Sequence, residues 1–381
     1  MSSLTAGAAN MPRSGIREIM DVAWQIQGPV IGLHVGEPSF TPPQHVIDAG
    51  MQAYARGDTH YVPNAGLGEL REALSEKIVS QNGFAATAEQ VVVTAGGVQA
   101  LYVAMSLTIA AGDEVLIPDP GWPNFAMMVG LLQATPVRYS LRAEHGFMPD
   151  LAELESLITE RTRMILVNTP SNPLGTVMNA EVVEALVRFA DRHDIWFLSD
   201  ECYDALTFDA EHVSPARFDV QDRVLSAFSF SKTYAMTGLR VGYLVAPPKI
   251  AQVAAKLQEP LISCVNAPAQ AAALAALRGP QEQVAGMRNE YLARRDAATS
   301  ALDELGIPYL VPQGAFYLWI DLRERAGSSI ADWALRFLNE QHVAIAPGTA
   351  FGAEGEGWAR LSLATDMGQL LEGISRIGRM E

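Results

Sequence analysis

Lys232 stands where a lysine is unusual. It follows the apolar run Val224–Phe228 after a short Ser-Phe-Ser link, whereas lysines mostly lie on solvated surfaces. The chain has only four lysines, and the other three fall on expected helices: Lys77, Lys249 and Lys256. A lysine drawn out of water is suited to forming a Schiff base with a carbonyl group. We therefore expect Lys232 to be the reactive amine, and Arg240, eight residues later, to reach the same pocket and clamp an anion.

Two further stretches suit a flat ligand that carries negative charge. Gly96 and Gly97 follow the run Val91–Thr94 and precede a helix, so their backbone N–H groups can approach a phosphate. Trp122 follows another apolar run between glycine and proline, where its ring can stack on a planar ligand. Taken singly, an ordinary strand-to-helix turn and a packed core aromatic explain these residues at least as well.

Polar side chains follow two more apolar runs. Asp200 ends one of them, and Tyr203 comes one helical turn later, which places both side chains on one face. A carboxylate at the end of a buried strand needs a partner, which a ligand, a buried salt bridge or a helix cap would each provide. Asn172 lies in the rigid turn Thr169–Gly175, where its amide either faces a ligand or simply belongs to the turn.

All of these residues are expected near the carboxyl ends of buried strands. Six short β-rich runs alternate with helical patterns: Val91–Thr94, Glu114–Pro118, Met164–Asn168, Ile195–Ser199, Val224–Phe228 and Val241–Val245. This alternation favours an α/β fold with a mainly parallel sheet covered on both faces. Ligands bind beyond the carboxyl ends of such strands, so the sequence predicts one shared pocket there.

The pattern changes after about residue 270. A long charged helix (281–305) is followed by further strand and helix patterns, which are typical of a smaller α+β unit. The segment that precedes the first sheet strand is expected to pack with this unit. We therefore predict an N-terminal arm (1–12), a small domain formed by 13–43 and 270–381, and a large domain formed by 44–269.

Composition and charge exclude several classes of protein. With 381 residues, 49% of them apolar, the chain can bury a large core and is not disordered. A net charge of −16 argues against binding nucleic acid or an anionic membrane. Cys202 and Cys264 form neither a disulfide framework nor a metal-binding pattern, so we expect no metal and a cytoplasmic protein.

Two apolar or terminal segments need a separate interpretation. The first ten residues lack the basic and apolar regions of a signal peptide. The uncharged run 91–112 is long enough to span a bilayer but contains glycines and polar residues. A short strand, a glycine turn and a buried helix explain that run better than a membrane span.

Together these residues point to a family. The stretch 229–243, Ser-Phe-Ser-Lys-Thr-Tyr-Ala-Met-Thr-Gly-Leu-Arg-Val-Gly-Tyr, resembles the cofactor-lysine signature of class I aminotransferases, the aspartate aminotransferase family of fold type I pyridoxal-phosphate enzymes. Shorter matches are Val35–Pro38, His60-Tyr61, Gly66–Arg71, Asn172–Gly175, Asp200–Tyr203, Pro347–Gly352 and Arg360–Ser362. The resemblance runs from about Pro12 to the end, and it implies a large domain with a seven-stranded, mainly parallel sheet between helices.

The resemblance implies how pyridoxal phosphate is held. Lys232 would bind the cofactor covalently and, once the substrate displaces it, move the proton from the substrate Cα. Asp200 would pair with the pyridinium nitrogen. The remaining contacts would be to the phosphate from Gly96, Gly97, Ser229 and Arg240, to the ring oxygen from Asn172 and Tyr203, and to the ring face from Trp122.

Substrate and partner contacts are implied as well. Arg360 would bind the substrate α-carboxylate, helped by the backbone of Gly36, and Ile16 would line the side-chain pocket. Tyr61 resembles the residue that is donated to the phosphate of the neighbouring subunit, which implies a homodimer with shared sites. The implied reaction is ping-pong transfer of an amino group from an L-amino acid to a 2-oxo acid such as 2-oxoglutarate.

Two departures from the family pattern bear on the ligands. Val98 stands in the phosphate cup where many relatives have a polar residue, so one side-chain contact is expected to be missing. The stretch Leu261–Val265 has no arginine, which one dicarboxylate-specific subgroup carries there, although another subgroup recognises dicarboxylates through different residues. We expect a donor with a neutral, apolar or aromatic side chain rather than a dicarboxylic one. Arg17 is either a partner of the substrate side chain or a surface arginine, and we expect it at the surface.

Two other functions remain open from the sequence. Carbon–sulfur β-lyases use the same site residues and would release pyruvate and ammonia from a thioether amino acid without an oxo-acid acceptor. A regulator with an aminotransferase-like domain would need an N-terminal DNA-binding segment, and the enzyme-like pattern that begins near Pro12 is expected to leave no room for one.

Overall fold

The computed structural model describes residue 9 and residues 11–380. The predicted N-terminal arm (1–12) therefore lies mostly outside the described residues. Within the described part of the chain, every helix is too short or too polar to cross a membrane.

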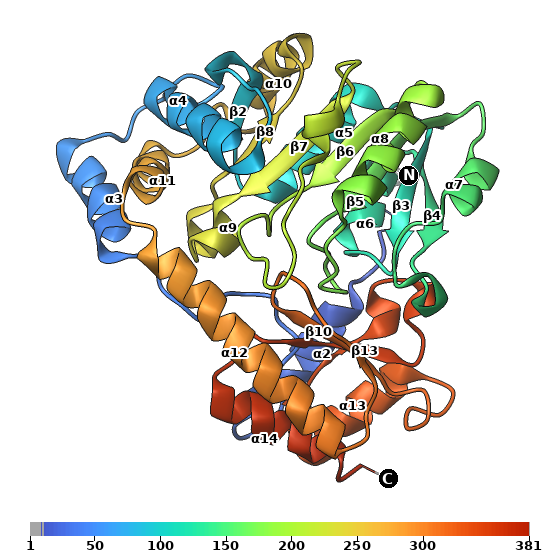
Figure 1. Cartoon of the computed structure of the whole chain (residues 1–381). Helices are drawn as coiled ribbons and strands as arrows, with labels where there is room; N and C mark the ends of the chain where they lie inside the picture. Colours follow the sequence, from blue (N-terminus) through green and yellow to red (C-terminus); the bar gives the residue numbers. More distant parts are fainter. Residues whose placement is uncertain (1–8, 10, 381) are drawn as a thin grey trace, which may run out of the picture.

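A seven-stranded sheet forms the centre of the larger part of the molecule (Figure 1). The strands lie in the order β2-β8-β7-β6-β5-β3-β4, and among them β8 alone runs antiparallel to its neighbours. Their bounds are β2 (Val91–Thr94), β3 (Glu114–Asp119), β4 (Thr135–Ser140), β5 (Thr162–Asn168), β6 (Trp196–Asp200), β7 (Val224–Ser229) and β8 (Gly242–Val245). The predicted α/β fold with a mainly parallel seven-stranded sheet is confirmed.

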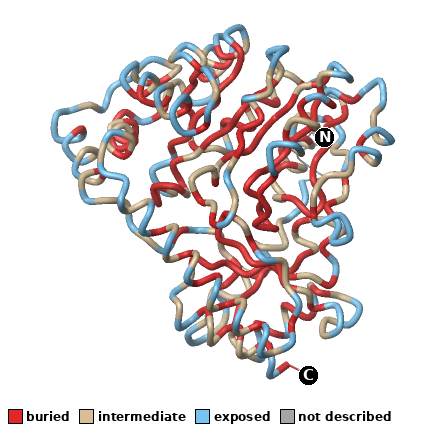
Figure 2. The backbone as a smooth tube through the Cα atoms, viewed as in Figure 1, coloured by how far each residue is buried: buried red, intermediate tan, exposed pale blue. Residues whose placement is uncertain are grey.

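Helices cover both faces of this sheet, which explains why its inner strands are buried on both sides (Figure 2). These helices are α3 (Gln44–Arg56), α4 (Gly68–Lys77), α5 (Gly97–Thr108), α6 (Asn124–Leu131), α7 (Leu151–Leu157), α8 (Ala180–Arg192), α9 (Phe230–Thr233), α10 (Pro248–Ile262) and α11 (Ala267–Arg278). Helix α8 illustrates how the sequence encodes such a helix. Asn179 caps its first turn by accepting a hydrogen bond from the Val182 N–H, and Val183, Leu186 and Val187 form the buried stripe that faces the sheet.

A smaller unit lies at the carboxyl edge of the large sheet (Figure 1). It contains the four-stranded sheet β12 (Ala346–Pro347), β13 (Trp358–Ser362), β10 (Tyr317–Asp321) and β9 (Tyr309–Leu310). Beside it, β1 (Ile31–Gly32) pairs in parallel with β11 (Val343–Ala344). Its helices are α2 (Gly15–Ala23), α12 (Glu282–Glu304), α13 (Ile330–Gln341) and α14 (Met367–Ile377).

The chain crosses between the two units near its start and again after α11. Ile19 and Leu33 share one hydrophobic core with Trp333 and Leu361, so the early segment packs with the carboxyl-terminal unit. Ala272 of α11 instead packs in a core with Val46 and other residues that cover the large sheet. The predicted domain boundaries remain a prediction, but the packing places α11 with the large sheet, and α12 is the helix with which the chain returns to the smaller core.

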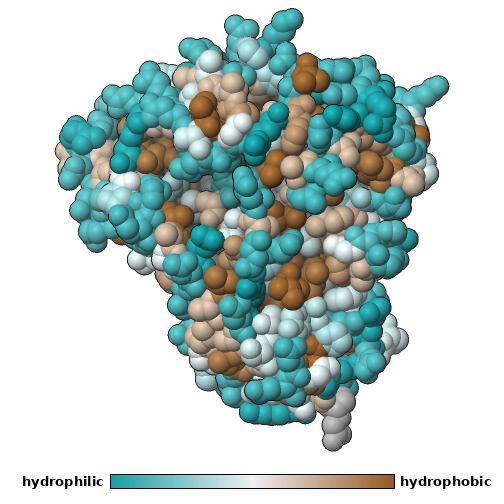
Figure 3. Space-filling view, in the orientation of Figure 1, coloured by the Kyte–Doolittle hydropathy of each residue, from teal (hydrophilic) through white to brown (hydrophobic). Residues whose placement is uncertain are grey.

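The visible face of the molecule is mostly hydrophilic, with hydrophobic residues gathered near its middle (Figure 3). Behind this surface, the carboxyl ends of β2, β3, β5, β6 and β7 all point towards the smaller unit. The fold therefore brings the turns that follow these strands together between the two units.

Candidate active site

A cavity of about 630 Å³ opens at the carboxyl ends of the large sheet. Most of the residues predicted from sequence line it: Ile16, Gly36, Gly97, Trp122, Asn172, Asp200, Tyr203, Ser229, Lys232, Arg240 and Arg360. They come from turns after five strands of the large sheet and from α2, β13 and the segment before α3. The expectation of one shared pocket is confirmed by this arrangement.

Lys232 lies on the short helix α9, immediately after β7. The Ser229 hydroxyl caps this helix by accepting a hydrogen bond from the Ser231 N–H at 3.1 Å, which fixes the turn that carries the lysine. The Lys232 amine donates a hydrogen bond to the Gly36 carbonyl and lies 5.7 Å from the centre of the Phe316 ring. Burial lowers the pKa of Lys232. The amine is thus shifted towards its neutral, nucleophilic form.

Asp200 is a buried carboxylate without a cationic partner. It ends β6, and its Oδ1 accepts a hydrogen bond from the Cys202 N–H at 3.2 Å. No lysine, arginine or histidine nitrogen of the described residues lies within ion-pair distance of its carboxylate. Burial raises the pKa of Asp200 to about 6, because the charged form loses hydration. A cationic N–H placed in the cavity would supply the missing partner.

Arg360 is the opposite case, a buried guanidinium without a carboxylate partner. It lies on β13, with only 2% of its surface exposed. Its Nη1 donates to Asn172 Oδ1 at 2.9 Å, and its Nη2 donates to the His34 carbonyl. Its Nε has no hydrogen-bond partner among the described residues. The guanidinium stacks over the Tyr317 ring, with its Cζ 4.3 Å from the ring centre. This stacking fixes the plane of the guanidinium N–H groups, which can then donate to an anion.

A second anion site lies at the start of α5. Gly96 has φ of 81° and precedes the free N–H groups of the first turn. A Cβ at Gly96 would stand 2.5 Å from Arg240 Nη2, so only glycine leaves room for the guanidinium. Arg240 is tied down by its Nη1, which donates to the Thr237 carbonyl at 2.8 Å. Backbone N–H groups, the Ser229 hydroxyl and Arg240 together suit a phosphate.

The remaining ring contacts are also in the cavity. Tyr203 shares a hydrogen bond between hydroxyls with Tyr317 at 2.8 Å, and burial raises the pKa of Tyr203, which keeps its hydroxyl a donor. The Asn172 N–H donates to Asn168 Oδ1 at 2.7 Å, which fixes the turn after β5. Trp122 lines the wall beside Phe125, which meets its ring edge to face. These side chains surround a space that suits a flat, polar ring.

Tyr317 and Asn168 are site residues that the sequence analysis missed. A Cβ on Gly36 would stand 2.0 Å from the Tyr317 hydroxyl, so Tyr317 can occupy this position only because residue 36 is a glycine. Asn168 holds the Asp200 carbonyl at 3.1 Å as well as the Asn172 turn. Tyr317 belongs to β10 of the smaller unit, and its meeting with Tyr203 depends on how the two units pack. The sequence analysis placed Asn168 at the end of a predicted strand, and this position was the one sign that it could belong to the site.

Apolar and polar side chains form the rest of the cavity lining. Ile16, Val98, Leu101 and Met127 form an apolar part, as the sequence suggested for Ile16, and Ser14, Glu37 and Asn124 form a polar part. Arg17 also lines the cavity and is exposed, so it lies at the surface, as expected, and borders the cavity as well.

Tyr61 lies away from this cavity. It is 87% exposed and borders a different surface hollow with Tyr54 and Cys264. Within one chain it therefore contacts none of the site residues described above. The described residues also contain no cluster of histidine, cysteine or acidic side chains arranged to hold a metal ion.

The geometry fits pyridoxal phosphate together with an amino acid. The anion cup at Gly96, Gly97 and Arg240 suits the phosphate, and the uncompensated Asp200 carboxylate suits a cationic ring nitrogen. The uncompensated Arg360 guanidinium suits a substrate carboxylate, and Lys232 lies in the same cavity. The unpaired buried charges thus match the charges of these two ligands.

Comparisons with known proteins agree with this geometry. The family model described as "Aminotransferase class I and II" matches residues 28–377. The chain is 38% identical over 371 residues to an aspartate aminotransferase of Pyrococcus horikoshii, covering 96% of this chain and 94% of that protein. It is 36% identical over 372 residues to aromatic-amino-acid aminotransferase 2 of Thermococcus litoralis, covering 96% and 95%.

Solved structures give the same result. The aspartate aminotransferase of Thermus thermophilus with maleate superposes with a TM-score of 0.95 at 36% identity, over 100% of both chains. Both the matched segment and the identity extend over nearly the whole chain, including every strand of the large sheet. The chain therefore belongs to the class I and II aminotransferases, and it is a fold type I aminotransferase that depends on pyridoxal phosphate.

Proposed function

We propose that the chain transfers an amino group from an L-amino acid with a neutral, apolar or aromatic side chain to a 2-oxo acid such as 2-oxoglutarate. The observation that carries this proposal is the pair of uncompensated buried charges, Asp200 and Arg360, which line the same cavity as Lys232. Arg360 selects an α-carboxylate and leaves the side chain of the substrate to the apolar part of the cavity.

Each residue has a definite task in this proposal. Lys232 anchors the cofactor, Asp200 pairs with its ring nitrogen, and Asn172 and Tyr203 hydrogen-bond its ring oxygen. Pyridoxal phosphate supplies, when bound, a conjugated ring that delocalises the electron pair left on the substrate Cα. Once the substrate amine has displaced it from the cofactor, the freed Lys232 Nζ would accept the Cα proton, for which its lowered pKa prepares it.

The substrate preference rests on the apolar part of the cavity lining. Relatives of similar identity are named for aspartate and for aromatic amino acids, so their names do not decide it. Ile16, Val98, Leu101 and Met127 offer apolar surface to a donor side chain, about 25 cal/mol for each Å² removed from water. Arg17, which borders the cavity while exposed, is a cation to which the second carboxylate of 2-oxoglutarate can bind.

We expect kcat/KM for phenylalanine or leucine to exceed that for aspartate by about 10-fold or more. An apolar side chain gains roughly 1.5–3 kcal/mol from full burial. The side-chain carboxylate of aspartate is one methylene shorter than that of 2-oxoglutarate, so it would lose hydration among the apolar walls without reaching Arg17. Steady-state rates with 2-oxoglutarate as the acceptor measure this ratio. A higher kcat/KM for aspartate would contradict the assignment, and pyruvate release from thioether amino acids without an acceptor would favour a β-lyase.

The shared site is the second part of the proposal. We infer a homodimer in which Tyr61 reaches the cofactor phosphate of the neighbouring subunit. Met51, Tyr54, Leu239 and Ile262 are exposed hydrophobic side chains, and with Arg240 they line a largely apolar hollow of about 750 Å³. Tyr54 also borders the neighbouring hollow that contains Tyr61. A partner subunit that covers this surface would bring its own Tyr61 close to Arg240.

A hybrid dimer tests the sharing directly. Lys232→Ala chains and Tyr61→Phe chains are each expected to form defective homodimers. If Tyr61 acts across the interface, a mixed dimer contains one site with both native residues and one site with both defects. Mixing the two inactive or weakened proteins should therefore raise the activity per mixed dimer towards half that of the native dimer. Tyr61 acting within its own chain would leave no native site, so an absence of any gain would contradict the proposal.

A further inference from the structure

The turn Asp200–Asp204 presents its side chains to two different environments. Asp200, Cys202 and Tyr203 line the cavity. Glu201, between them, points away from the cavity and has no exposed surface at all. The proposed mechanism gives this fully buried carboxylate no task.

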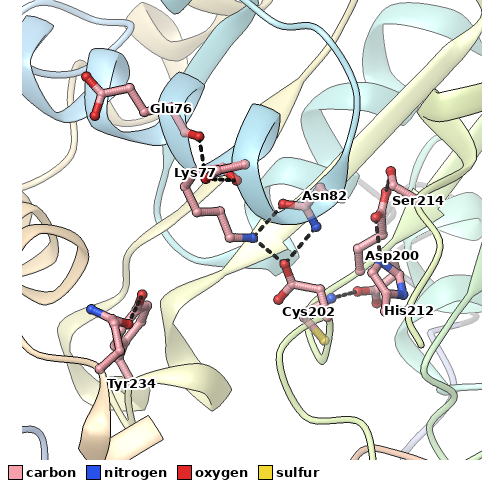
Figure 4. Close-up of polar contacts among 12 residues, drawn as sticks. Glu76, Lys77, Asn82, Asp200, Cys202, His212, Ser214 and Tyr234 are labelled. Atoms are coloured by element: carbon pink, nitrogen blue, oxygen red, sulfur yellow. Dashed lines mark hydrogen bonds and ion pairs between the residues drawn. The ribbon is translucent and has the colours of Figure 1, made fainter. Parts of the chain in front are cut away.

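The Glu201 carboxylate is bonded by two residues of a later loop, His212 and Ser214. His212 Nε2 lies 2.8 Å from Glu201 Oε2, and the Ser214 hydroxyl donates to Glu201 Oε1 at 3.1 Å. All three side chains are buried. His212 Nδ1 has no partner among the described residues, so the favoured ring proton is on Nε2, where it donates to the carboxylate. Figure 4 shows His212 and Ser214 gathered beside Asp200.

The other end of the turn has an anchor of its own. Asp204 forms an ion pair with Lys77 and accepts a hydrogen bond from the Asn82 side chain at 3.1 Å. Lys77 ends α4, and Asn82 lies in the π-helical turn Ile78–Asn82 that follows it. In Figure 4 this pair approaches the turn from the side opposite to His212. The turn is therefore fixed at Glu201 and at Asp204, on either side of Cys202 and Tyr203, and Asp200 directly precedes the first of these anchors.

We propose that His212 and Ser214 are positioning residues for cofactor binding: by holding Glu201, they hold the neighbouring Asp200 carboxylate in the direction of the cavity. Asp200 depends on such help because, within the described residues, no side chain outside the turn bonds its carboxylate. Its direction is set by the Asp200–Glu201 peptide, whose N–H donates to the Ala227 carbonyl of β7 at 2.9 Å and whose carbonyl accepts hydrogen bonds from the Asn168 side chain at 3.1 Å and from the Thr169 N–H at 3.2 Å. The Glu201 side chain, held by His212 and Ser214, adds a further constraint on the orientation of this peptide.

The effect of losing His212 follows from burial. A buried carboxylate that loses a donor must find another donor or water, because an uncompensated buried charge is costly. Glu201 would turn to do so and would pull on the Asp200–Glu201 peptide against the hydrogen bonds that hold it to Ala227, Asn168 and Thr169. The anchor at Asp204 would keep the rest of the turn in place, so the disturbance should concentrate at Asp200.

The affinity of the apoenzyme for pyridoxal phosphate is the direct readout. This inference rests on the proposed role of Asp200. We expect His212→Phe to raise the Kd for the cofactor by about 10-fold or more, the scale found when outer-layer partners of a bound group are removed. His212→Gln keeps an N–H donor close to the position of Nε2 and should stay within about threefold of native. Ser214→Ala should show a smaller rise than His212→Phe.

A double-mutant cycle separates positioning from a general loss of stability. In an Asp200→Asn background, His212→Phe should change the cofactor Kd by less than about twofold, because its effect passes through the Asp200 carboxylate. His193→Phe is the matched control, since His193 forms a similar pair with Glu155 at 2.7 Å on an exposed surface far from the site. That variant should leave the cofactor Kd unchanged.

The outcomes separate the proposed role of Asp200 from the proposed positioning role of His212 and Ser214. If Asp200→Asn itself leaves the cofactor Kd unchanged, the proposed role of Asp200 is wrong. If Asp200→Asn weakens binding while the His212 and Ser214 variants, folded as judged by circular dichroism, bind the cofactor normally, the positioning inference alone is wrong. Equal effects of His212→Phe with and without the Asp200 carboxylate would also overturn it. Where His212→Phe fails to fold, the Gln and Ser214→Ala variants still provide the comparison.

Discussion

Replacing Lys232 with alanine should lower kcat by about 10⁴-fold or more while the fold stays intact. The substitution removes the anchoring amine and the group that accepts the Cα proton, and general acid–base catalysis alone contributes up to about 10⁴-fold. The stability cost should be small, because the amine bonds only the Gly36 carbonyl and its burial already disfavours its charge. Steady-state turnover and the thermal unfolding midpoint of the same preparation measure both effects.

A small primary amine in solution provides the control for this variant. Such an amine can enter the space left by the lysine side chain and accept the same proton, so it should restore part of the activity in proportion to its concentration. Lys256→Ala, on the outer helix α10, should keep native turnover. Full transamination by the Lys232→Ala enzyme without added amine would remove Lys232 from its assigned role.

Replacing Arg360 with alanine should weaken amino-acid binding by about two to three orders of magnitude. Truncating one partner of a buried, hydrogen-bonded charge pair costs about 2–5 kcal/mol, and each 1.4 kcal/mol is a factor of about ten. Arg360→Lys should recover only part of the loss, because an ammonium lacks the planar fork that the stacked guanidinium presents. Substrate Kd, measured from the spectral change on titration, separates this effect from a change in kcat.

The matched control is Arg294, another arginine that is nearly buried. It lies on α12, contacts the Phe40 and Tyr291 rings, and does not line the cavity. Arg294→Ala should cost stability and leave the substrate Kd within about twofold of native. The cofactor Kd of Arg360→Ala should rise far less than its substrate Kd, although Asn172 loses one hydrogen-bond donor. Equal substrate affinity in Arg360→Ala and the native enzyme would refute its assignment.

The central sheet could be predicted because its strands are buried on both faces. A doubly buried strand is a continuous apolar run, and the run Val91–Thr94 coincides with β2. The edge strand β4 escaped prediction because it is only partly buried: Tyr139 is its one buried residue, and Thr135 and Arg138 are exposed. Its sequence therefore lacks the apolar run that identified the others.

The candidate site could be predicted wherever a residue directly follows a strand of the large sheet. Asp200 and Lys232 fall in this class. The position of Tyr317 and the contacts of His212 and Ser214 with Glu201 could not be predicted, because they depend on how segments far apart in the chain pack together. His212 lies in a loop with no periodic pattern, and its meeting with Glu201 is visible only in three dimensions. The same holds for Arg17, whose position at the rim depends on the packing of α2.

Titrating the visible absorption of the holoenzyme with single amino acids, without any oxo acid, tests the central claim most directly. The account predicts that phenylalanine and leucine convert the lysine-bound cofactor to its amine form, with release of the corresponding 2-oxo acid, at concentrations well below those that aspartate requires. Arg360→Ala should shift every donor to much higher concentration. Conversion by aspartate at the lowest concentration would contradict the substrate preference. A spectrum that no donor changes, with pyruvate formed from thioether amino acids, would contradict the proposed transamination.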